Sequence, residues 1–113
     1  MDDEHYHLDD ALMRLEQGLR AGSHMLASLQ LAELALKLDR AIRREERLLR
    51  VTGRPAVRIR QEHASLRRLV GSVAAALDRA DDRRARDLIT QLRSVLLLHA
   101  AKEEPFLAAA REA

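Results

Sequence analysis

The chain has 113 residues, of which 47% are hydrophobic, 34% are charged and 2% are aromatic. This length suits a single domain over residues 1–113, and the few aromatic residues exclude the stacking platforms of single-stranded nucleic-acid readers. There is no cysteine, which excludes disulfides, zinc–thiolate sites and cysteine nucleophiles. Twenty basic residues against 18 acidic ones leave a formal charge of +2, so we expect no nucleic-acid partner.

The sequence contains no signal for a membrane or for export. No apolar run approaches the roughly 18 residues that a transmembrane helix needs. The acidic start Met1-Asp2-Asp3-Glu4 lacks the apolar core of a signal peptide. We therefore expect a cytoplasmic protein with no membrane partner.

Apolar residues recur at helical spacing along almost the whole chain. The predicted helices cover residues 3–20, 25–51, 55–79 and 82–110. The first helix ends at Gly22, and Ser23 is suited to cap the second. Thr52-Gly53-Arg54-Pro55 separates the second helix from the third, and Asp81 or Asp82 caps the fourth. Such short connections predict an all-α, up-down-up-down antiparallel four-helix bundle.

A shift of 58 residues aligns two parts of the sequence, residues 4–49 and 62–107. The polar pairs that match are Glu4-His5 with Glu62-His63 and Glu45-Glu46 with Glu103-Glu104. Helix packing explains matched leucines, but it does not require matched polar residues. The polar pairs are therefore the informative part of this internal repeat.

Five polar residues interrupt the apolar faces of the predicted helices, at positions where a bundle core needs leucine. They are His5, Glu45, His63, His99 and Glu103. Burial of such groups without partners costs on the order of several kcal/mol each, so they must be satisfied together. In an antiparallel bundle, the starts of odd helices and the ends of even helices lie at the same end. We therefore expect all five groups to converge at one level of the core.

Three imidazoles and two carboxylates that face one another predict a transition-metal site, for which bundle cores are a recurrent home. His99 and Glu103 lie one helical turn apart, so both side chains can reach the same metal cluster. Without cysteine, the available ligand atoms are nitrogen and oxygen. This set suits iron best and also admits manganese or zinc.

The pattern of a His followed by His-x-x-x-Glu, here His63 and His99-x-x-x-Glu103, resembles the hemerythrin-like (HHE cation-binding) family. The first half matches through His5 and Glu45, so the resemblance covers nearly the whole chain. It implies a hemerythrin-like bundle with two bridged non-heme irons that binds or activates O2, or responds to peroxide or NO. It also implies that the three histidines bind iron through nitrogen and that the two glutamates bridge the metals.

One position departs from the family pattern, because the repeat places Ala41 where the second helix would carry a His. One of the two metals then keeps only His5 and the shared carboxylates. The missing ligand is replaced by water, Asp9 or His7, or only one metal binds. Two other functions remain open: an oxidative metalloenzyme acting on a small organic substrate, and a metal-poor helical interaction module with Arg-rich faces.

Overall fold

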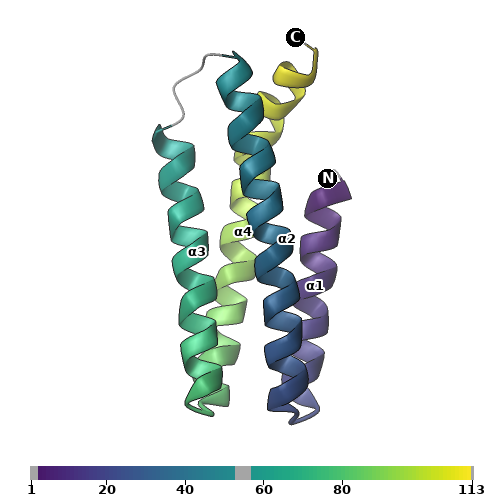
Figure 1. Cartoon of the computed structure of the whole chain (residues 1–113), viewed down its shortest axis with the longest axis vertical. Helices are drawn as coiled ribbons and strands as arrows, with labels where there is room; N and C mark the ends of the chain where they lie inside the picture. The colour runs from purple at the N-terminus through teal and green to yellow at the C-terminus, as the bar shows by residue number, and fades with distance from the viewer. Residues whose placement is uncertain (1–2, 53–56, 113) are drawn as a thin grey trace.

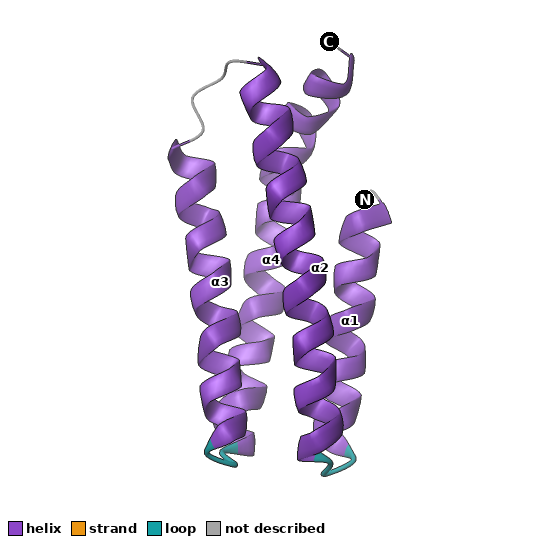
Figure 2. Cartoon of the chain, viewed as in Figure 1, coloured by secondary structure: helices purple, strands orange, loops and turns teal. Residues whose placement is uncertain are grey.

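The computed structural model describes the backbone of residues 3–52 and 57–112, and the side chains of residues 7–51 and 57–101. Within these ranges the chain forms four α-helices and no strand, as the apolar periodicity predicts (Figure 2). The helices are α1 (Asp3–Arg20), α2 (His24–Thr52), α3 (Val57–Asp78) and α4 (Asp82–Glu112). None of the helices in this part of the chain combines the length and the apolar character of a membrane span.

The predicted helix ends are right for both ends of α1 and for the start of α4, and the other described ends differ by one or two residues. α2 begins at His24 rather than at residue 25, because a helix starts directly after its N-cap residue. α4 continues two residues beyond the predicted end, to Glu112. The predicted start of the third helix, at Pro55, lies outside the described residues, and the described helix begins at Val57.

The helices run along the long axis of a molecule that measures 47 × 23 × 19 Å. The turns that join α1 to α2 and α3 to α4 lie at the same end, while the N-terminal end of α1 and the C-terminal end of α4 point away from it (Figure 1). α2 and α4 each contact the three other helices. These two helices therefore face each other across the short diagonal of the cross-section.

The two short turns share one backbone conformation. Gly22 in the first turn has a φ angle of 73°, and Ala80 in the second has a φ angle of 56°. The amide of the following residue donates a hydrogen bond to the carbonyl five residues before it, at 3.2 Å for Ser23 and 2.9 Å for Asp81. Both turns are thus left-handed helix ends of the kind that favours glycine. They are related by the 58-residue offset of the sequence repeat.

The residues after these turns cap the helices that follow. Ser23 Oγ accepts a hydrogen bond from the Leu26 amide at 3.2 Å, and Asp81 Oδ1 accepts one from the Arg84 amide at 3.1 Å. Both caps satisfy a backbone donor that the first helical turn leaves unpaired. Asp81 is therefore the cap of α4. The side chain of Asp82 instead pairs with His24, at 2.6 Å.

Every helix contributes leucines to one apolar core. The most deeply buried include Leu12 and Leu15 of α1, Leu34 of α2, Leu66 of α3 and Leu92 of α4. Burial of each such side chain stabilises the fold by about 1.5–3 kcal/mol. Near the end opposite the two short turns, polar side chains replace leucine in this core.

The turn geometry predicts the effect of exchanging glycine and alanine. The substitution Ala80→Gly is expected to raise the free energy of unfolding by about 0.5–1 kcal/mol, because it relieves a left-handed conformation that alanine tolerates poorly. Gly22→Ala is expected to lower it by a similar amount. Urea denaturation measures both, with Ala75→Gly at an exposed position inside α3 as the control, which should be destabilising.

Candidate metal centre

Three side chains from three helices meet in the core. Glu45 of α2, His63 of α3 and His99 of α4 are exposed by only 3%, 0% and 4%. Glu45 Oε2 lies 2.8 Å from His63 Nε2 and 3.2 Å from His99 Nε2, and the two Nε2 atoms are 3.2 Å apart. These three atoms form a nearly equilateral triangle around one buried point.

The other ring nitrogen of each histidine faces a second carboxylate. His63 Nδ1 lies 3.1 Å from Glu46 Oε1, and His99 Nδ1 lies 2.8 Å from Glu62 Oε2. Each ring therefore lies between two carboxylates, the outer one at Nδ1 and Glu45 at Nε2, and an ionised carboxylate can only accept hydrogen bonds. In the tautomer with its proton on Nδ1, each ring donates to the outer carboxylate and turns the Nε2 lone pair toward the triangle.

In this tautomer the triangle suits a cation. Two imidazole lone pairs and one carboxylate oxygen would face one another within 3.2 Å, with no hydrogen between them. A proton on one of the three atoms or a metal ion at the centre relieves repulsion of this kind in a buried place.

The dimensions of the triangle fit a metal ion. Metal–ligand bonds of about 2.0–2.1 Å at tetrahedral or octahedral angles place neighbouring ligand atoms about 2.8–3.4 Å apart. The observed separations of 2.8 to 3.2 Å match this spacing. The histidine rings cross at 67°, so their Nε2 atoms approach the centre from different directions. Among the described residues, these three form the group able to hold a metal.

Helical periodicity explains why these residues point inward. Glu45 lies three and four residues from the buried side chains of Ile42 and Leu49 on α2, and His99 follows Leu92 and Leu96 on α4. Residues at this spacing share one face of a helix. Burial of the apolar residues on the same helix faces therefore places the polar groups in the core.

The structure brings together three of the five predicted metal ligands. The side chains of the other two, His5 and Glu103, lie outside the described residues. His7 is exposed. Asp9 lies beside Arg93, with 3.7 Å between Oδ1 and Nε, and it is not a member of the three-residue group.

Sequence reasoning missed the roles of Glu46 and Glu62. Both side chains are partly exposed, at 27% and 23%, so they do not interrupt the apolar faces of their helices. The available signal was the internal repeat, in which the pairs Glu45-Glu46 and Glu62-His63 stand out among leucine matches. Carboxylates that hold the far nitrogen of a metal-binding histidine fix its ring orientation and raise its basicity.

Comparison with known proteins adds no further information about this centre. No protein-family model matches the chain, and neither the curated proteins nor the solved structures include one that matches it.

The outer carboxylates provide a prediction about metal affinity. Glu62→Gln keeps the three ligand atoms but removes the charge that orients His99, so it is expected to weaken zinc(II) binding by about tenfold or more. Isothermal titration calorimetry measures this loss. Glu33→Gln, at a partly exposed position of α2 where the carboxylate pairs with Lys37, is the matched control and should bind as the parent does. Equal affinities in both variants would contradict the role of Glu62.

Proposed function

We propose that the chain is a hemerythrin-like, up-down-up-down antiparallel bundle that uses non-heme iron to bind or activate O2, or to respond to peroxide or NO. The observation that carries the proposal is the convergence of Glu45 Oε2, His63 Nε2 and His99 Nε2 at one buried point. Two imidazoles and one carboxylate on one face of a metal form the ligand set of non-heme iron(II) sites with open positions. Iron bound there would supply the electrons for chemistry with O2, peroxide or NO.

The protein's own contribution is to position the ligand atoms and to exclude water. With a metal bound, Glu46 and Glu62 would accept the Nδ1 protons, which leaves both Nε2 atoms available as ligands. Burial of Glu45, His63 and His99 keeps bulk water away from the site. Three different helices carry these residues, so metal binding depends on the packed fold.

A second iron is the part of the proposal that rests most on the family resemblance. Its ligands would be His5 and Glu103 together with the shared Glu45. Ala41, where the repeat places a His, is buried and offers no ligand atom. The metal held by His63 and His99 is therefore expected to be the tighter one.

Metal analysis and absorption spectroscopy test the proposal. The chain purified without added metal and then loaded with iron(II) is expected to hold at least one iron and to develop charge-transfer bands in air. Free iron at about 100 times its Kd should stabilise the fold by about 2.7 kcal/mol, because it binds only the folded state. His63→Ala is expected to abolish both effects.

The matched control for this variant is His24→Ala. His24 is half exposed and pairs with Asp82 far from the centre, so its loss should leave iron binding unchanged. A chain that binds no iron, or that is colourless and holds only zinc, would overturn the proposed function. An equal loss of iron in both variants would contradict the assignment of the site.

The substitution Ala41→His tests whether the missing ligand limits the second metal. Restoring an imidazole at this position is expected to raise the iron content to two per chain or to tighten the weaker site. Titration with iron(II), followed by absorption, measures the stoichiometry. Unchanged stoichiometry and affinity would show that position 41 does not determine the second site.

A further inference from the structure

The outer face of α2 carries an apolar ridge, formed by Met25, Leu29, Ala32 and Leu36. The three large side chains are 79%, 63% and 52% exposed, and Ala32 between them is exposed as well. The four residues recur at helical spacing, so they share one face of α2. The ridge is therefore a continuous apolar surface in contact with solvent.

The equivalent face of α4 has the opposite character. The 58-residue repeat matches the ridge with four positions of α4 that are polar or charged and are not buried: Arg83, Asp87, Thr90 and Ser94. A helix of this bundle can thus present a fully polar face at these positions, and the fold does not need the apolar side chains of the ridge. A contiguous apolar surface of this kind marks a contact with another molecule.

A groove of about 280 Å³ lies beside the ridge, between α2 and α3. Ala32 of the ridge and Ala35 line it from α2, while Gly71 and Ala74 are among the residues that line it from α3. The side chains on both walls are small, so the two helices leave the space between them open to solvent.

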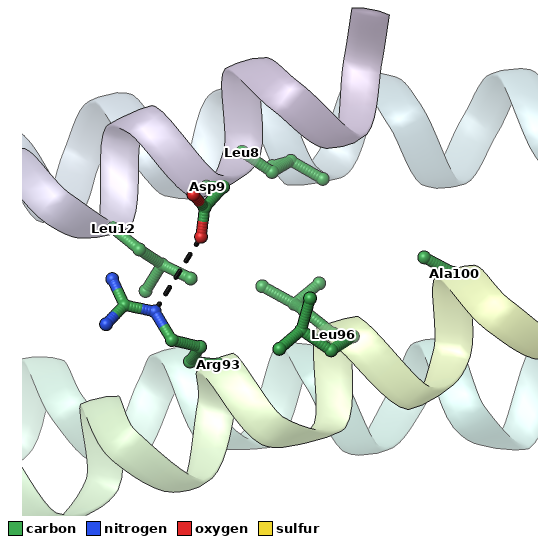
Figure 3. Close-up of a pocket in the computed structure, with 7 residues that line it drawn as sticks. Leu8, Asp9, Leu12, Arg93, Leu96 and Ala100 are labelled. Atoms are coloured by element: carbon green, nitrogen blue, oxygen red, sulfur yellow. Dashed lines mark ion pairs between the residues drawn. The ribbon is translucent and has the colours of Figure 1, made fainter. Parts of the chain in front are cut away.

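The contact between α1 and α4 shows what fills this space in the other half of the repeat. Arg93 extends from α4 toward Asp9 of α1 (Figure 3), and its Nη1 atom lies 2.8 Å from Glu16 Oε1. The repeat places Ala35 and Ala74 where this contact has Arg93 and Glu16. The groove therefore exists because two small side chains stand in place of a long ion pair.

The charges at the two ends of the groove have opposite signs. Asp78 lines the end near the turn between α3 and α4. One helical turn beyond the other end, Asp39 pairs with both Arg43 and Arg67, each at 3.0 Å, which leaves an excess of positive charge. A copy of this surface that runs in the opposite direction would bring each acidic end against a basic one.

We propose that this α2–α3 face binds a second copy of the chain, with the two copies antiparallel about a two-fold axis near Ala32. Both copies offer the same patch to a two-fold interface, so the patch must be complementary to itself. The ridge of one copy fills the groove of the other, and the charged ends match. The ridge and the groove share no residue with the metal centre, so the interface does not depend on the proposed function.

Sedimentation equilibrium of the full chain tests the association. The parent is expected to pass from one to two chain masses as its concentration rises. Leu29→Lys should weaken the dimer by about tenfold or more, because the charge on each ridge would lose its hydration in the interface. Met13→Lys, at a half-exposed position of α1, is the matched control and should dimerise as the parent does.

Two results of this experiment would contradict the proposal. A parent chain that stays monomeric at every concentration would show that the face serves a different partner. Equal dimer affinities in Leu29→Lys and Met13→Lys would show that the dimer forms through another surface.

A second variant fills the groove and leaves the ridge intact. Gly71→Met introduces the residue that the repeat has at position 13, and a Cβ atom at position 71 meets no atom within 4 Å. The variant should fold at least as stably as the parent, because methionine favours a helix more than glycine does. Its dimer should be about tenfold weaker or more, since the groove is occupied. Ser72→Met, at an exposed position of α3, is the control, and equal affinity in both variants would disprove the packing of ridge into groove.

Single cysteines test the two-fold axis, since the chain has no cysteine of its own. Under mild oxidation, Ala32→Cys is expected to form a disulfide-linked dimer, because its two copies lie near the axis and within reach of each other. Thr90→Cys, at the equivalent position of α4, should link at least about tenfold more slowly. Met25→Cys lies two turns from the axis on the same ridge, and rapid linkage there would disprove the antiparallel arrangement. Gel electrophoresis without reductant measures all three rates.

Discussion

The meeting of one carboxylate oxygen and two imidazole nitrogens at one buried point is the constraint on which the rest of the structure depends. Glu46 and Glu62 face the outer nitrogens of His63 and His99, whose inner nitrogens face Glu45. A core can hold such a group only when a proton or a metal ion is shared among these atoms. The centre therefore affects the stability of the fold as well as any chemistry at the site.

The remainder of the molecule supplies the rigidity that this constraint requires. Leucines from all four helices fill the core below the centre, so the ligand-bearing ends cannot move apart without disturbing that packing. α2 and α4 lie on the short diagonal, which brings Glu45 and His99 face to face. Two left-handed turns of the same kind join the helices of each hairpin at the far end.

The sequence predicts the helices and the buried members of the centre for the same reason, because periodicity reveals which residues face the core. Glu45, His63 and His99 were found as interruptions of apolar faces. Periodicity could not reveal Glu46 and Glu62, since partly exposed glutamates resemble any solvated residue. Nor could it show the left-handed conformation of Ala80, which depends on how α3 and α4 meet rather than on the preference of alanine.

The ligand residues come from both helical hairpins, so a bound metal ion would link the two hairpins. Glu45 belongs to the first hairpin, whereas His63 and His99 belong to the second, at sequence separations of 18 and 54 residues. A metal ion at their meeting point would staple the two hairpins together, much as a disulfide joins distant segments. In a chain without cysteine this staple is reversible and responds to metal supply, so a chelator could loosen the joint without breaking a covalent bond.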